Sequence, residues 1–395
     1  MNILYISTSM DEDLIAKIKL KNSNYSIAAI KYADLIRKGL ENNKSIVLTN
    51  VFSPTFTTWP HVNTFLFFNH RQLSGKYISF INLPFLKQFT MSFSVFVKTL
   101  GWVLKSKRKE KNIIILSSIQ LPFLLGTFFL KLWGVKIVSF VPDLPQYQYG
   151  YTRDRNIIRR FFTPLYIKIC NIFIYAIDYY VFITKQMVTL FPHRPFTIME
   201  GLVDLNDSSS IECPEEHAFI VMYAGSLHET MGIRLLLDAF EQMEENMELW
   251  IFGTGDLQSL VEEKAKICKK IKYYGRVSNN DIIRYEQKVD LLINPRFSSQ
   301  EFTKYSFPSK LMEYMLSGTP VLTTRLPGIS EEYNDLMYFI EDETVEGVRK
   351  SIIECYRKKP EEFQRRGRDT KKYVLENKNC NVQIDRIINH IVQNL

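Results

Sequence analysis

The residues best suited to chemistry in this sequence are Lys310 and Glu313, which stand three positions apart. They fall in a run that reads as a helix, with Ser306 and Pro308 suited to its start and Gly318 to its end. Side chains three apart share a helix face, and the N–H groups of the first turn attract anions. Such a site could bind an anionic ligand with hydroxyl groups, for example a nucleotide diphosphate on its ribose. The alternative is an ordinary capped helix with a surface ion pair.

Other patterns that would indicate a cofactor are weak or missing in the sequence. Gly253-Thr254-Gly255 lacks the third glycine of a dinucleotide fingerprint, and no GxxxxGK[ST] phosphate loop occurs. No pair of histidines has the spacing of a zinc site. The acidic run Asp11-Glu12-Asp13 lies in a polar stretch that gives it no support as a metal-binding motif. We therefore expect neither a metal ion nor a cofactor.

Strands and helices alternate regularly around Lys310, which predicts a doubly wound parallel sheet in the second half of the chain. Ligands of such sheets lie beyond the carboxyl ends of the strands. The segments at that edge here are Gly225–Gly232, Gly253–Gly255, Gly275–Val277, Asn294–Ser306 and the helix start at Ser309. The expected strands are Phe219–Ala224, Glu248–Phe252, Ile271–Tyr274, Val289–Asn294 and Pro320–Thr324, and the expected helices between them are Ile233–Glu244, Leu257–Lys269 and Asp281–Lys288.

The first half shows the same alternation less clearly. Ser9 to Asn24 reads as a polar loop, Phe52–Phe93 is not assigned, and Val95–Lys111 is expected to be a helix with a basic end. The uncharged run from Asn112 to Leu130 is interrupted by polar residues, proline and glycine, so a strand, a turn and an apolar helix explain it better than a membrane span. The other expected elements are strands at Asn2–Ser7, Ser45–Asn50, Ile113–Leu116, Lys136–Val141 and Tyr180–Ile183, and a helix at Tyr25–Leu40.

Charge is divided unevenly between the two halves. Residues 1–200 contain 25 Lys and Arg against 10 Asp and Glu, whereas residues 201–395 contain 25 against 32, which together make the 50 basic and 42 acidic residues of the chain. The basic half suggests an acidic partner, either an anionic membrane or nucleic acid, or simply a solvated surface. The span Arg153–Ile183 mixes basic and aromatic residues and is slightly favoured as an interfacial helix.

Composition changes near Met199 to Glu216, and we place a domain boundary there. We expect an N-terminal domain at residues 1–200 and a C-terminal domain at 201–379. The last helix, within 380–395, is expected to pack back on the first domain. The five cysteines are scattered and lack CxxC spacing, which favours a reducing compartment without disulfides.

The turns of the second half, taken in order, resemble the C-terminal half of retaining glycosyltransferases of family 4 (group 1). They are Tyr223-Ala224-Gly225-Ser226-Leu227, Phe252-Gly253-Thr254-Gly255, Tyr274-Gly275-Arg276-Val277 and the segment from Glu313 to Pro320. The resemblance is specific from about Tyr223 to Thr324, and in the first half it rests on Val141–Pro145 and Met199–Asp204. It implies the α/β GT-B architecture, with two Rossmann-like doubly wound domains facing each other across a cleft.

By position, the resemblance implies that Glu313 binds the ribose hydroxyls, that Lys310 faces the diphosphate and that Asp143 lies near the donor sugar. We expect Asp143 and Lys310 to be catalytic, because a departing diphosphate and a cationic sugar both need opposite charge. The family further implies that the acceptor attacks the sugar on the same face from which the diphosphate leaves. The donor-binding residues expected are Gly225, Ser226, Gly253, Arg276, Val277, Arg296, Tyr305, Ser309, Lys310 and Glu313.

The sequence departs from the family pattern in two places. Tyr305 stands where the family has the first of two glutamates, and Glu301 lies four residues earlier. Ser226 and Met231 stand where the family has basic residues that clamp the diphosphate. Lys310, together with Arg296 or Lys304, could supply that charge, and Arg234 is a weaker candidate.

These observations predict a glycosyltransferase of hexosyl type that uses a nucleotide-diphosphate sugar and a lipid-linked or oligosaccharide acceptor, as in bacterial capsule or surface polysaccharide synthesis. We expect it to be cytoplasmic and peripherally bound to the inner face of an anionic membrane, without nucleic acid as partner. The alternatives are a nucleotide-sugar epimerase of the same fold and a catalytically weak scaffold subunit of a polysaccharide-assembly complex.

Overall fold

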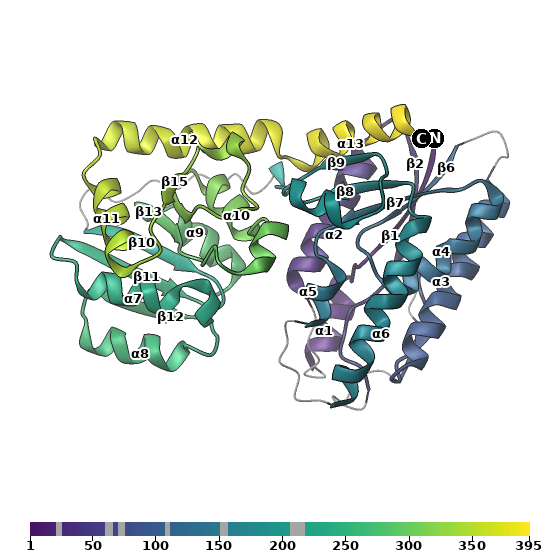
Figure 1. Ribbon diagram of the computed structural model, residues 1–395, viewed down its shortest axis with the longest axis horizontal. Coiled ribbons are helices and arrows are strands. Elements are labelled where there is room, and N and C mark those ends of the chain that lie inside the picture. Colours follow the sequence, from purple (N-terminus) through teal and green to yellow (C-terminus); the bar gives the residue numbers. More distant parts are fainter. Residues whose placement is uncertain (21–25, 60–65, 70–75, 107–110, 151–156, 206–217) are drawn as a thin grey trace. The chain divides into compact units, whose positions relative to one another are not determined.

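The computed structural model describes residues 1–20, 26–59, 66–69, 76–106, 111–150, 157–205 and 218–395, which divide into two compact units (Figure 1). Unit 1 comprises Met1–Leu202 and Cys380–Leu395, and unit 2 comprises Val203–Asn379. Each unit is built on a parallel sheet with helical connections, as the alternation of apolar runs and helical patterns predicts.

The sheet of unit 1 contains seven strands within the described residues, in the order β4-β2-β1-β6-β7-β8-β9, and every neighbouring pair is parallel. The order reverses between β1 and β6, as in doubly wound folds. The strands are β1 (Asn2–Ser7), β2 (Val47–Phe52), β4 (Lys76–Tyr77), β6 (Asn112–Leu116), β7 (Lys136–Val141), β8 (Tyr179–Phe182) and β9 (Phe196–Ile198). A separate antiparallel pair is formed by β3 (Phe67–Phe68) and β5 (Phe80–Ile81).

Helices α2 (Ile27–Asn42) and α13 (Cys380–Asn394) pack against one another and share one core with the strands of unit 1. This core includes Ile36, Ile384 and Ile387, so the last helix of the chain contributes to the interior of unit 1. The remaining helical segments of the unit are α1 (Glu12–Leu20), α3 (Leu86–Lys105), α4 (Leu121–Phe128), η1 (Phe129–Trp133), α5 (Pro145–Gly150), α6 (Ile157–Phe173), η2 (Ile174–Ala176) and η3 (Lys185–Leu190).

The sheet of unit 2 has six parallel strands among the residues described, in the order β12-β11-β10-β13-β14-β15, which reverses between β10 and β13. The strands are β10 (Phe219–Ala224), β11 (Met247–Phe252), β12 (Ile271–Gly275), β13 (Leu291–Asn294), β14 (Val321–Thr324) and β15 (Tyr338–Ile340). The helical segments are η5 (Glu229–Met231), α7 (Ile233–Glu241), α8 (Gln258–Ile267), α9 (Asn279–Glu286), η6 (Glu301–Tyr305), α10 (Ser309–Ser317), η7 (Glu331–Tyr333), α11 (Val345–Tyr356) and α12 (Pro360–Asn377).

Three expectations about local structure were wrong. The polar stretch after Ser9 contains helix α1, because Leu14 and Ile18, one turn apart, are both buried. Helix α3 begins at Leu86, nine residues before the expected start at Val95, and it ends at Lys105. Helix α10 has Pro308 as its N-cap, whereas Ser306 follows the preceding 3₁₀ helix η6 as its C-cap.

Some expectations fall partly on residues that are not described. Residues 206–216 of the expected boundary segment and the beginning of the basic span Arg153–Ile183 lie outside the described ranges. Within the described part, no helix is both long enough and apolar enough to cross a membrane. The described cysteines, Cys170, Cys268, Cys355 and Cys380, are free thiols.

Candidate functional site

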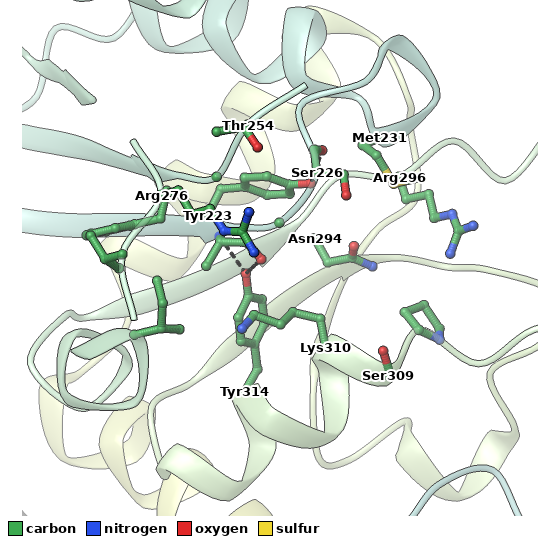
Figure 2. A pocket seen from close by; sticks show the side chains of 17 residues that line it. Tyr223, Ser226, Met231, Thr254, Arg276, Asn294, Arg296, Ser309, Lys310 and Tyr314 are labelled. Atoms are coloured by element: carbon green, nitrogen blue, oxygen red, sulfur yellow. Dashed lines mark hydrogen bonds between the residues drawn. The ribbon is translucent and has the colours of Figure 1, made fainter. Parts of the chain in front are cut away.

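A cavity of about 450 Å³ lies in unit 2, at the point where the strand order reverses. Its lining comes from the turns after β10, β11, β12 and β13 and from the start of α10, so five separate segments contribute to it (Figure 2). The size is within the range of small-molecule sites, and the location is the one at which doubly wound sheets bind their ligands.

Eight of the expected donor-binding residues line this cavity: Gly225, Ser226, Gly253, Arg276, Val277, Arg296, Ser309 and Lys310. Glu313 does not line it, but its carboxylate accepts a hydrogen bond from Lys310. Tyr305 ends the 3₁₀ helix η6 and is also not part of the lining. The cation Arg234 pairs with Glu229 on the surface, with 2.9 Å between Nε and Oε1.

Glycine at position 253 is required by the close approach of two of these turns. Its φ is +128°, and a Cβ atom would lie only 1.8 Å from the carbonyl oxygen of Gly225. The turns are joined by backbone hydrogen bonds from Gly225 N–H to the Phe252 carbonyl (3.0 Å) and from Gly253 N–H to the Gly275 carbonyl (2.8 Å). Ligand and backbone can approach closely here because no side chain stands between them.

Lys310 is held between two carboxylates. Its Nζ lies 2.7 Å from Oε2 of Glu313 and 3.0 Å from Oε1 of Glu286, whose side chain on α9 is only 1% exposed. Burial alone lowers the pKa of the Lys310 ammonium, but Glu286 and Glu313 outweigh burial and raise that pKa above its ordinary value. Lys310 is therefore positively charged at neutral pH and directed at the cavity (Figure 2).

The side chains that line the cavity include several basic ones. Its lining contains three basic side chains, Arg276, Arg296 and Lys310, and among the described residues that line it no acidic one. The guanidinium of Arg296 also lies over the ring of Phe302, with 4.3 Å from Cζ to the ring centroid. Together with the N-terminus of α10, these groups favour a ligand with more than one negative charge, such as a diphosphate.

Two buried tyrosines stabilise the turn after β10. The Ala224 N–H donates to the hydroxyl of Tyr314 (2.8 Å), and the hydroxyl of Tyr223 donates to the Ser226 carbonyl (2.9 Å). Burial raises the pKa of both phenols well above the ordinary value, so both remain neutral across physiological pH. Tyr314 thus links α10, which carries Lys310, to the turn that carries Gly225.

Asp143 belongs to unit 1 and is exposed in the turn after β7. Its charge contributes, after burial, to the raised pKa of the Tyr32 phenol. In the residues that are described, no group of three or more His, Cys, Asp or Glu side chains could hold a metal ion.

Sequence reasoning did not identify Glu286 or Tyr314 as site residues, and it named Tyr223 and Asn294 only as the first residues of a turn and a loop, without a role for their side chains. Glu286 and Lys310 are 24 positions apart on different helices, and nothing in the local sequence indicates that they pair. Asn294 had a usable signal, because it is a polar residue directly after an apolar strand that precedes the Lys310 helix. The structure places it in the cavity wall, where its amide donates to Thr323 Oγ1 at 2.9 Å.

Comparison with known proteins gives results consistent with this arrangement. Residues 218–358 match the family model of glycosyl transferases group 1. No curated protein matches the chain in a sequence comparison. The chain is similar in structure to sucrose-phosphate synthase from Thermosynechococcus elongatus, with 13% identity over 100% of this chain and 99% of that one and a TM-score of 0.64.

Two further solved structures are similar over 100% of both chains. One is the lipopolysaccharide outer core galactosyltransferase WaaB in its apo form, with 15% identity and a TM-score of 0.61. The other is Anabaena HepE in complex with UDP, with 12% identity and a TM-score of 0.63. At these identities the likeness shows the fold alone. The chain therefore has the two-sheet GT-B fold, and its segment 218–358 is similar to glycosyl transferases group 1.

Proposed function

We propose that the protein transfers a sugar, of hexosyl type, from a nucleotide-diphosphate donor to a lipid-linked or oligosaccharide acceptor. The observation that carries this proposal is the cavity of unit 2, in which three cations and a helix N-terminus converge without an acidic residue among the described lining. The family match of this segment and the UDP bound to the structurally similar Anabaena HepE support the same ligand class.

In this proposal Lys310 and Arg276 contact the diphosphate, and Glu313 accepts hydrogen bonds from the ribose. Glu313 already lies one helical turn from Lys310 and shares its ammonium with Glu286. A bound diphosphate would compete for that ammonium, which frees Glu313 to accept from hydroxyl groups. Glu286, which is buried, stays in place as the counterion.

The chemical step requires that negative charge on the leaving diphosphate be stabilised while positive charge develops on the sugar. We assign the first role to Lys310 and the N-terminus of α10. We assign the second to Asp143 of unit 1, which follows β7 at the carboxyl end of the first sheet. Membrane association of the acceptor at the inner face of a bacterial membrane completes the proposal.

Nucleotide binding is tested by differential scanning fluorimetry of the full chain with UDP, GDP, ADP and dTDP, followed by calorimetry with the nucleotide that gives the largest shift. A ligand that binds only the folded protein raises its unfolding temperature. We expect Glu313→Ala to weaken binding of that nucleotide by about 1–3 kcal/mol, since hydrogen bonds to a charged group are lost. The exposed Glu354→Gln serves as the matched control. Unchanged affinity in Glu313→Ala would contradict the ribose assignment.

Turnover separates the proposed transferase from the two alternatives. With a sugar nucleotide and bacterial lipid extract, a transferase releases nucleotide diphosphate only when acceptor is present, whereas an epimerase needs no acceptor. We expect Lys310→Ala to lower the rate constant more than donor affinity, because the leaving charge develops in the transition state. Nucleotide binding without any turnover would favour the catalytically weak scaffold subunit. This alternative is relevant because the cavity wall contains the neutral residues Ser226 and Met231.

A further inference from the structure

Helix α3 of unit 1 turns large apolar side chains toward solvent along its length. Phe89 and Phe93 are each 69% exposed, Val97 is 50% exposed and Leu104 is 68% exposed. Their spacing of four, four and seven residues places them on one face of the helix. On a helix of a water-soluble protein this face is normally polar, so the outer face of α3 needs another explanation.

The buried face of α3 is mixed. It consists of Met91, Val95 and Val103 together with the hydroxyl residues Ser92 and Thr99, which donate to carbonyl groups of their own helix at 2.7 Å. The neighbouring helix α4 approaches closely at Gly126, where a Cβ atom would lie 2.5 Å from Val95. The outer face of α3 is therefore as apolar as its buried face, and the helix lacks the polar outer face of an ordinary amphipathic helix.

The segment η1 extends this apolar surface. It contacts α3, and it exposes Phe129 (55%), Leu132 (82%) and Trp133 (48%). Tryptophan is enriched where a protein meets the boundary between lipid and water. The exposed apolar residues of α3 and η1 are called the α3–η1 surface below, and Figure 1 shows α3 and α4 side by side within unit 1.

The charged side chains on the elements of this surface are basic, and the nearby Asp178 is paired with Lys131 of η1, 3.1 Å from Nζ to Oδ1. Helices α3 and α4 and the segment η1 contain no acidic residue, and the sequence has no Asp or Glu between Glu41 and Glu110. Lys105 is exposed in the last turn of α3, and Lys98 lies near Lys76 of β4. The surface therefore combines exposed apolar side chains with basic ones.

We propose that the α3–η1 surface docks on an anionic lipid bilayer, with α3 lying in the plane of the interface. In this position the phenylalanine side chains enter the boundary between the lipid headgroups and the acyl chains, and the lysines reach the lipid phosphates, as in interfacial amphipathic helices. The inference rests on the proposed function, because the surface would bring the enzyme to its lipid-linked acceptor. In this proposal the α3–η1 surface, and not the span Arg153–Ile183, is the membrane contact. A second copy of the chain fits less well, because it would bring the same positive charge to the contact.

The test is flotation of the full chain with vesicles of phosphatidylcholine alone or with phosphatidylglycerol added. We expect binding to the anionic vesicles only, weakened at least about tenfold in Phe89→Gln/Phe93→Gln because two large apolar groups no longer leave water. Lys98→Gln/Lys105→Gln should weaken binding and reduce its dependence on salt. The matched control is Ile267→Gln/Val392→Gln, which removes exposed apolar side chains from α8 and α13 and should bind as the parent does.

Unchanged vesicle binding in the phenylalanine variant, or equal binding of the parent to neutral vesicles, would overturn the proposal. Self-association would be the better explanation if the parent does not bind vesicles, is a dimer in sedimentation velocity and becomes a monomer in the phenylalanine variant. That result would overturn the proposal. Nucleotide binding by unit 2 is measured on the same variants. If nucleotide binding is absent while vesicles still bind through α3, the proposed function fails and the membrane surface stands. If nucleotide binds and vesicles do not, the membrane surface fails and the proposed function stands.

Discussion

Lys310 has two anionic neighbours of different kinds, and this difference decides what each can do. Glu286 is buried on α9, whereas Glu313 is half-buried on the same helix as Lys310. A buried carboxylate moves little and costs much to leave unpaired, while a partly exposed one can exchange its partner for a ligand. We therefore assign Glu286 as a positioning residue that keeps Lys310 charged and in place.

This assignment predicts a shifted pH profile for Glu286→Gln. The pKa of Lys310 is raised in the folded protein, so its positive charge persists below that pKa and is lost as pH rises through it. Without Glu286, burial and one remaining carboxylate act on the ammonium, and the pKa falls. The alkaline limb of nucleotide binding should therefore move to lower pH.

Binding at neutral pH should not weaken in Glu286→Gln, because the variant also removes a negative charge near the diphosphate. Calorimetry from pH 7 to 11.5 measures both effects, with UDP or with whichever nucleotide diphosphate binds best. Glu286→Asp should restore part of the parent profile, and Glu354→Gln should leave it unchanged. If the alkaline limb stayed where it is in the parent, Glu286 would be merely structural.

At the scale of elements, the site depends on turns that touch one another. Gly253 combines a φ of +128° with a Cβ position 1.8 Å from a carbonyl oxygen, whereas Gly275 has a φ of +68° with its nearest neighbouring atom at 3.9 Å. Gly275→Ala therefore suffers only from its backbone conformation. Gly253→Ala must in addition displace the turn at Gly225 that lines the cavity.

We expect Gly253→Ala to lower the free energy of unfolding of unit 2 by about 2–3 kcal/mol, and Gly275→Ala by about 1 kcal/mol. Urea unfolding followed by circular dichroism measures this difference. Nucleotide affinity should fall in Gly253→Ala and remain close to that of the parent in Gly275→Ala. Equal losses of stability in the two variants would show that the turns do not depend on their close approach.

Elements with a local signal could be predicted from sequence, and elements that depend on distant partners could not. The cap of α9 is local, because Ser278 accepts the N–H of Asp281 three residues further on. The first part of α3 was not recognised because its exposed face is as apolar as its buried one, which removes the periodicity of an ordinary surface helix. Helix α1 was missed because the acidic run at its start reads as a loop, although two apolar residues one turn apart were visible.

The candidate site divides in the same way. The glycine turns and the Lys310 helix follow strands, so their order in the sequence indicated that they meet at one sheet edge. Glu286 and Tyr314 act through contacts across 24 and 90 positions, with Lys310 and Ala224 respectively, and no short pattern encodes such pairs. Tyr305 was expected at the donor from a family position and does not line the cavity.

At the scale of the whole molecule, the chain has two cores, and its last helix belongs to the first of them. Ile384, Ile387, Ile388 and Ile391 of α13 are buried with strand residues of unit 1, although the chain passes through unit 2 before reaching them. Unfolding of such a protein need not be a single transition. A change in α13 should therefore act on unit 1, and a ligand of the cavity should act on unit 2.

Tryptophan fluorescence can separate the two units. The chain has four tryptophans, of which Trp250 is in unit 2 and Trp59, Trp102 and Trp133 are in unit 1. In a Trp250→Phe background the emission reports unit 1 alone. We expect Ile387→Ala to lower the free energy of unfolding of unit 1 by about 2–4 kcal/mol, because it leaves a cavity in a filled core. Val392→Ala, at a half-exposed site, should have little effect.

Unit 2 is followed by the emission of Trp250 in a chain whose other three tryptophans are replaced by phenylalanine. A bound nucleotide diphosphate should raise the unfolding temperature of unit 2 and leave the unfolding temperature of unit 1 unchanged. If Ile387→Ala lowered both transitions equally, the two cores would unfold together, and α13 would stabilise the entire chain.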